Sequence, residues 1–207
     1  ASVRCVWVDI TLAQAQVNMV ERLLTRFGSL PGPSRLRDAA RREPGLLTPT
    51  QQMRAVREFE APAADEGFTE VVRVPFERAS SAHGDGAGAF VATDVLETAR
   101  WREAVAPIDG QQAALVFAWR PDGNAAAVAA AAERLMTRVP GIVERAVCLH
   151  GGGPPLCWCR PPLPGLLLAF TRRHALDPTR CVLIGVSAAH RTLAATLGAR
   201  FVDATPE

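Results

Sequence analysis

The chain has 207 residues, 48% of them hydrophobic, and a formal net charge of +2. This length allows one large domain or two small ones with a buried core, and so small a charge does not by itself indicate a nucleic-acid-binding protein. The sequence contains no lysine. This excludes any mechanism that needs a lysine ammonium group, such as phosphate binding by the lysine of a P-loop.

The first third of the chain predicts a strand, three helices and a second strand. A β-branched run predicts a buried strand over 3–11. A helix is predicted over 12–28, with an apolar face and a glycine at its end. Two further helices are expected at 34–43, which is rich in arginine, and at 48–60. A second strand is expected at 68–76.

A small, polar and glycine-rich stretch, "ERASSAHGDGAGA", follows at 77–89. Such a composition is typical of a linker or long loop. We therefore divide the chain into a segment at 1–79, a linker at 80–88 and a second domain at 89–207.

The second domain alternates between strand and helix patterns. Strands are predicted at 89–96, 113–119, 142–147, 180–187 and 199–204. Helices are predicted at 124–138, 163–176 and 188–198. This alternation predicts an α/β fold with a mainly parallel sheet and right-handed crossovers.

The cysteines indicate a reducing compartment. The chain has five, an odd number, and its start lacks the pattern of a secretory signal. No apolar stretch approaches the ~20 residues needed to span a bilayer. We expect a cytoplasmic protein that makes no membrane contact and uses clustered cysteines for metal binding rather than for disulfides.

Four of the metal-ligating side chains lie within twelve residues: Cys148, His150, Cys157 and Cys159. Three thiolates and one imidazole form a closed tetrahedral set that is typical of structural zinc. Two alternatives are free buried cysteines and a disulfide, although a bridge across one intervening residue would be strained. The spacing therefore predicts a structural zinc ion without a metal-bound water.

The segments "CLHGGGPPLCWCRPPLPGLLLAF" and "DPTRCVLIGVSAAHRTLAATLGARFV" resemble the zinc-containing branch of the haloacid dehalogenase (HAD) superfamily. Histidinol-phosphate and heptose bisphosphate phosphatases belong to that branch. The resemblance covers about 88–204 and implies a HAD-like, Rossmannoid fold. It also implies that the four ligands above hold the family's zinc ion.

The catalytic residues of that family do not carry over. The resemblance implies an aspartate nucleophile, a second aspartate two residues later, a Ser or Thr, a Lys, and Mg²⁺-binding aspartates. The only acid that remains at these positions is Asp94. The other positions hold Ala92, Trp119, Pro161, Val186 and His190. Without the nucleophile and the cations, we expect neither an aspartyl-phosphate nor a Mg²⁺ site, and hence a pseudo-phosphatase.

Three remaining polar residues near these positions have ordinary interpretations. Ser187 is expected to cap the helix that begins at 188. His190 is expected on the surface rather than as a ligand or base. Arg160 is expected to be solvated or ion-paired, although it could meet an anion.

The segments "WVDITLAQAQVNMVERLL" and "QQMRAVREFEAPAADEGFTEVVRVPF" resemble the last third of P-loop kinase domains of the polynucleotide-kinase type. This resemblance covers about 3–77, and the P-loop itself is not in the sequence. The chain is then either the C-terminal part of a longer kinase–HAD fusion or a reduced protein. In both cases the strand at 3–10 lacks neighbours, so we expect a homo-oligomer or a contact with a missing upstream kinase half.

These observations favour a non-catalytic, zinc-stabilised HAD-like module attached to a partial kinase-like segment. One alternative is an active HAD phosphatase, or a nucleic-acid end-processing kinase–phosphatase whose P-loop lies upstream. A third possibility is nucleic-acid binding through the arginine-rich helices, which the small net charge and few aromatic residues disfavour.

Overall fold

The computed structural model describes residues 2–77 and 84–205. Its second half is built on a five-stranded sheet in the order β5-β4-β3-β6-β7, in which every neighbouring pair is parallel. The strands are β3 (Ala89–Ala92), β4 (Ala113–Trp119), β5 (Ile142–Cys148), β6 (Val182–Gly185) and β7 (Arg200–Asp203). The predicted α/β fold with a mainly parallel sheet is confirmed.

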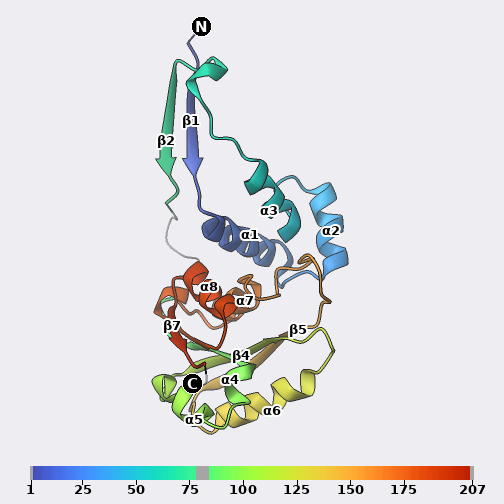
Figure 1. The fold of residues 1–207 in the computed structure, drawn as a ribbon, viewed down its shortest axis with the longest axis vertical. Coiled ribbons are helices and arrows are strands. Elements are labelled where there is room, and N and C mark those ends of the chain that lie inside the picture. Colours follow the sequence, from blue (N-terminus) through green and yellow to red (C-terminus); the bar gives the residue numbers. More distant parts are fainter. Residues whose placement is uncertain (1, 78–83, 206–207) are drawn as a thin grey trace.

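Helices cover both faces of this sheet (Figure 1). One face carries α4 (Thr93–Leu96), α5 (Trp101–Ala104) and α6 (Ala125–Met136), and the other carries α7 (Gly165–Arg173) and α8 (Ala188–Leu197). Two short 3-10 helices lie in the connections of this domain, η2 (Ala106–Ile108) and η3 (Pro178–Arg180), and a third, η1 (Ala64–Glu66), lies in the first part of the chain. Covering helices on both faces explain why the central strands read as continuous apolar runs.

The order of the strands reverses at β3, which lies in the middle of the sheet. The chain adds β4 and β5 on one side of β3, and then β6 and β7 on the other. In open α/β sheets, ligands bind outside the carboxyl ends of the strands where the order reverses. The carboxyl edge of β3 and β6 is therefore a candidate position for a ligand-binding site.

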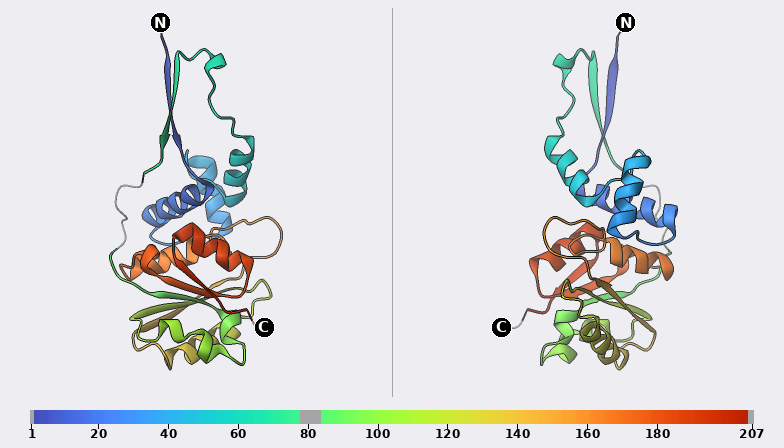
Figure 2. Two further views of the ribbon diagram at one scale, coloured as in Figure 1. Left: turned by 60° about the vertical axis from the view of Figure 1, so that its left-hand side comes forward. Right: turned by 90° about the vertical axis from the view of Figure 1, so that its right-hand side faces the viewer.

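A further helical layer packs over α7 and α8 (Figures 1 and 2). It contains α1 (Leu12–Phe27), α2 (Pro33–Arg42) and α3 (Pro49–Glu58). Capping boxes start α1 and α3, with Thr11 and Thr48 as the N-caps. Buried residues of α1, such as Leu23, belong to the same hydrophobic cluster as the sheet, so the first third of the chain shares a core with the second domain.

A two-stranded parallel ribbon projects away from the helices (Figure 2). It is made of β1 (Arg4–Asp9) and β2 (Glu70–Pro75). The prediction that β1 is buried is wrong, because Val6 and Val8 are 56% and 54% exposed. Only the opposite face of β1 is covered, where Trp7 packs on Phe59 with ring centroids 5.7 Å apart.

The strand predicted at 89–96 ends earlier than expected. β3 stops at Ala92, and residues Thr93–Leu96 form α4 instead. The buried Thr93 hydroxyl donates to the carbonyl of Phe117 on β4, which holds the turn directly above the end of the strand. The end of β3 is thus set by a tertiary contact, which the apolar pattern of the sequence does not reveal.

Residues 78–83, which include the first part of the predicted linker at 80–88, lie outside the described residues. The rest packs against the segment after α7. Gly86 donates its N–H to the carbonyl of Ala175 at 3.2 Å, and a Cβ at Gly84 would lie 2.1 Å from that same oxygen. Glycine is required at 84 because the two backbones approach so closely. No helix in the described part of the chain is long and apolar enough to cross a membrane.

Candidate metal centre

The four predicted ligands lie in the connection between β5 and α7. Cys148 is the last residue of β5, and His150 follows as the chain leaves the sheet. Cys157 and Cys159 lie on the return before α7. Between the two pairs, Gly153 has a φ of 84°, a left-handed conformation that favours glycine. The sequence therefore folds into a loop whose two ends carry a ligand pair each.

The ligand atoms converge on one point. The Cys148 Sγ lies 3.7 Å from the Cys157 Sγ, 3.4 Å from the Cys159 Sγ and 3.5 Å from the His150 Nδ1. The His150 Nδ1 lies 3.2 Å from the Cys159 Sγ. All four atoms lie within 4.8 Å of one another, and no other group of three or more such side chains occurs among residues 2–77 and 84–205. One metal ion could contact all four.

The three sulfur atoms are shielded from solvent. Cys148, Cys157 and Cys159 are buried and pack against Leu30 and Leu166. Hydrogen bonds from Cys148 and Cys159 lower the pKa of Cys157, whereas the hydrogen bond with Cys157 raises the pKa of Cys148 to about 11. The hydrogen bonds with Cys148 and Cys157 raise the pKa of Cys159.

A bound metal ion favours the deprotonated form of each thiol that it contacts. The donor set is thus suited to a cation that supplies the missing positive charge.

The loop is held from the side by the end of β4. The indole Nε1 of Trp119 donates to the carbonyl of His150 at 2.8 Å. The Arg160 guanidinium lies 3.8 Å from the centre of the Trp119 ring and donates to the carbonyl of Gly153 at 2.8 Å. The prediction for Arg160 is therefore only partly right: it is held by an aromatic ring and a carbonyl rather than by an acid. Sequence reasoning treated Trp119 only as a lost catalytic position and missed this supporting role.

The loop also contacts the outer helical layer. Trp158, which separates the two cysteines of the return, is buried and donates from Nε1 to the carbonyl of Leu47 at 3.0 Å. The Thr50 hydroxyl donates to the carbonyl of Pro155 at 3.0 Å. Gly165, the first residue of α7, donates its N–H to the Trp158 carbonyl at 3.0 Å. The first two of these contacts were not predicted, since they join residues more than 100 positions apart.

The carboxyl edge at the strand reversal holds an internal ion-pair network. Arg120, the residue after β4, places one guanidinium nitrogen 3.0 Å from Asp94 and 3.0 Å from Glu97. The Arg120 side chain is 20% exposed, and the two carboxylates are about half exposed. The pKa of Arg120 is raised, because the two acids outweigh its partial burial. Asp94 is therefore matched by a cation from the same chain.

Ser187 and His190 lie at the start of α8 on the same edge. Ser187 caps the helix as predicted, since its hydroxyl accepts the His190 N–H at 3.2 Å. The expectation that His190 lies on the surface is wrong, because it is 9% exposed and packs edge-on against Phe117. Its Nδ1 accepts the N–H of Val186, and burial lowers the pKa of His190. It is held there as a neutral packing residue.

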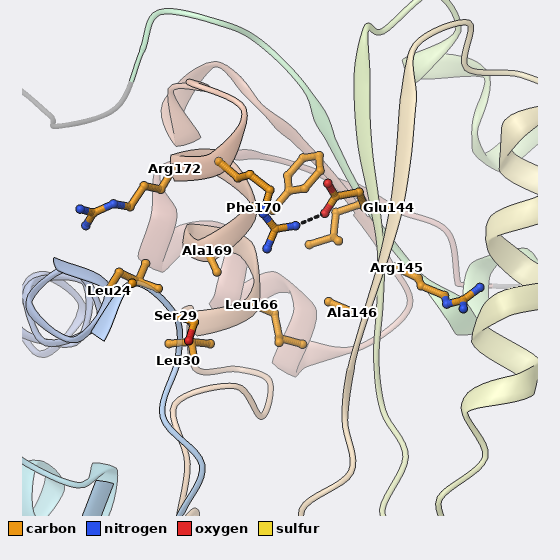
Figure 3. Close-up of a pocket in the computed structure, with 13 residues that line it drawn as sticks. Leu24, Ser29, Leu30, Glu144, Arg145, Ala146, Leu166, Ala169, Phe170 and Arg172 are labelled. Carbon is orange, nitrogen blue, oxygen red and sulfur yellow. Dashed lines mark hydrogen bonds and ion pairs between the residues drawn. The ribbon is translucent and has the colours of Figure 1, made fainter. Parts of the chain in front are cut away.

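A pocket of about 450 Å³ opens beside the metal loop, between the end of α1, α7 and the free edge of β5 (Figure 3). Its apolar wall includes Leu30 and Leu166, which also pack against the cysteines. Among the charged residues of its wall, Glu144 contacts both Arg173 and His174, the latter at 2.7 Å.

Comparisons of the chain with protein-family models, with curated proteins and with solved structures gave no match. The site is therefore interpreted from its geometry alone. That geometry consists of four converging ligands in a supported loop, next to a carboxyl edge whose acid is ion-paired.

Proposed function

We propose that the chain is a non-catalytic, HAD-like pseudo-phosphatase module that is stabilised by a structural zinc ion. The observation that carries this proposal is the closed cluster of Cys148, His150, Cys157 and Cys159 in the connection between β5 and α7. It accounts for a long loop that has little regular structure, because a bound ion supplies the free energy that orders such a loop.

Zinc suits this cluster in ligand type and in spacing. Three sulfurs and one imidazole nitrogen favour a borderline-soft cation over Mg²⁺ or Ca²⁺. Sulfurs bound about 2.3 Å from a tetrahedral zinc ion lie about 3.8 Å apart, and the observed separations from Cys148 to the other sulfurs are 3.4 and 3.7 Å. Four protein ligands leave no position for a metal-bound water, so we assign the ion a structural role.

The carboxyl edge supports the lack of catalysis. The resemblance places the nucleophile at Ala92, whose methyl group cannot attack phosphorus. Asp94, the acid that remains, is paired with Arg120 at 3.0 Å. His190 is buried and has its Nδ1 engaged by the backbone. No group on this edge is thus positioned to form and hydrolyse a phosphoryl intermediate.

Two measurements test this proposal. We expect about one zinc ion per chain in protein purified without added metal. We also expect no hydrolysis of small phosphate esters above background in the presence of Mg²⁺, for either the wild type or Asp94→Asn. Turnover that Asp94→Asn abolishes would establish the alternative, an active phosphatase. Substoichiometric metal in a folded protein would contradict the structural role of zinc.

We further propose that the free edge of β1 is the contact for a second copy of the chain. β1 pairs only with β2 among the described strands. It contains no proline, whereas the outer edge of β2 includes Pro75, which cannot donate to a further strand. The exposed Val6 and Val8 lie on the uncovered face. An isolated two-stranded ribbon is marginal in water, so an added strand would stabilise it.

Light scattering at several protein concentrations tests this contact. We expect a dimer that Val6→Lys weakens, because an added charge on a free strand opposes edge pairing. A wild-type monomer at every concentration would refute it. The kinase-like origin of residues 1–79 and the cytoplasmic location stay predictions, the latter supported by the need for reduced thiols.

A further inference from the structure

We propose that the metal centre is a latch that holds α3 against the sheet domain. Loss of the metal would then release α3 and, with it, the residue after α3 that packs on the β1–β2 ribbon. This inference rests on the proposed zinc site. It concerns what the ordered loop does for the rest of the chain, beyond its own stability.

The latch consists of two hydrogen bonds, one between the metal loop and the turn that leads into α3 and one between the loop and the first turn of α3. Trp158 donates to the Leu47 carbonyl at 3.0 Å, and Thr50 donates to the Pro155 carbonyl at 3.0 Å. Trp158 lies between the ligands Cys157 and Cys159, so its position depends directly on where the two sulfurs are held. Trp158 is also 2% exposed, so this contact is shielded from water.

The first helix of the same layer is attached differently. α1 packs on α7 and α8, and Arg172 of α7 donates to the Thr25 hydroxyl of α1 at 2.8 Å. These contacts do not pass through the metal loop. α3, in contrast, is joined to α1 by the bond from Gln52 to the Ala15 carbonyl and to the loop by the latch. Loss of the loop's order therefore removes both hydrogen bonds of the latch, while the bond between α1 and α7 does not depend on the loop.

The release of α3 has a consequence at the far end of the molecule. α3 ends at Glu58, and the next residue, Phe59, packs on Trp7 of β1. Phe59 is the ring that covers this face of the ribbon, and it is placed there by the end of α3. Movement of α3 would withdraw Phe59 and leave only the Arg73 guanidinium, 5.6 Å from the centre of the Trp7 ring, over this face of β1 among the ring contacts of the described residues. The metal state of the loop is thus mechanically connected to the strand that we propose as the contact for a second copy.

Hydrogen exchange of the full chain tests the latch. With zinc bound, amides in α3 are expected to be protected. After chelation we expect them to exchange at least tenfold faster while amides in α1 and in the last turn of α7 change little, since local opening lets one segment exchange without global unfolding. Unchanged exchange in α3 would overturn the latch, and so would an equal acceleration in all three helices.

A variant that keeps every ligand separates the latch from zinc binding itself. Trp158→Phe combined with Thr50→Val removes both donors, and each lost bond is expected to contribute a few-fold, giving about tenfold faster exchange in α3 with zinc content unchanged. Thr25→Val is the matched control, because it removes a threonine hydroxyl from the α1–α7 contact instead; it should leave exchange in α3 unchanged. Equal α3 exchange in the double variant and the wild type would refute the latch alone. A protein that binds no zinc would refute both the latch and the proposed function.

Discussion

Gly165→Ala tests whether the first turn of α7 supports the metal loop as the contacts indicate. A Cβ at this position would lie 2.3 Å from the Trp158 carbonyl oxygen and 2.9 Å from Leu30 Cδ1, whereas an ordinary contact begins at 3.4 Å. Trp158 is buried, so the carbonyl cannot move toward solvent. The helix start and the loop must therefore separate by about 1 Å, which displaces the residue between two metal ligands.

The expected loss of stability follows from three effects. Overpacking a filled core costs about 1–3 kcal/mol, and weakening the bond from the Gly165 N–H to the Trp158 carbonyl costs about 1 kcal/mol. Alanine's greater helix propensity offsets up to about 1 kcal/mol. The net loss of about 1–4 kcal/mol should lower the melting temperature by about 2–16 °C for a chain of this size.

Thermal unfolding in saturating zinc measures this effect, and Gly152→Ala in the same loop is the control. An added Cβ at Gly152 meets no atom within 4 Å, and its backbone is not in the left-handed region. The control should melt at the wild-type temperature or slightly above it, because alanine restricts the unfolded chain. If Gly165→Ala melted within about 1 °C of the wild type, the proposed support of the loop by α7 would be wrong.

Three further changes have defined outcomes. Cys159→Ser should lower zinc affinity by about 100-fold or more, since a structural site derives its large binding free energy from all four ligands. The control is Cys181→Ser, which changes a buried cysteine outside the cluster. Metal analysis of this control should give the wild-type zinc content. Because burial lowers the pKa of His190 and an unfolded histidine titrates near about 6.5, the unfolded state binds more protons just below that pH, and stability should fall as the pH falls. Denaturant titrations at pH 7.5 and 5.5 should show a smaller loss for His190→Gln than for the wild type, and equal losses would contradict this cause. Arg120→Gln should reduce the free energy of unfolding by no more than about 1 kcal/mol, because its two acid partners are half exposed. Phosphate-ester hydrolysis by this variant should stay at background. A gain of turnover would show that Arg120 alone blocks an otherwise competent site.

Much of the candidate site could be predicted because its ligands are close in sequence. The spacing of Cys148, His150, Cys157 and Cys159 places four donors in one short loop, and the fold brings their ligand atoms together. Local chemistry also predicted Ser187 as a helix cap. These features depend on neighbouring residues, so a single sequence is sufficient to find them.

The supporting contacts of the site could not be predicted in this way. Trp158 and Leu47 are 111 positions apart, and Trp119 and His150 are 31 positions apart. No periodicity or motif connects such residues, because the sheet and the helical layer must form before they meet. The pairing of Arg120 with Asp94 likewise required two adjacent strands to end at the same edge.

The sequence by itself determined the alternation of strands and helices, and hence a parallel α/β sheet, because side-chain periodicity and turn residues act over a few positions. It also determined the set of four metal ligands. Only the tertiary structure decided that β1 lies in an exposed ribbon, that β3 ends at Ala92 and that His190 is buried. Burial and strand ends depend on what packs above each residue, and that is settled by elements far away along the chain.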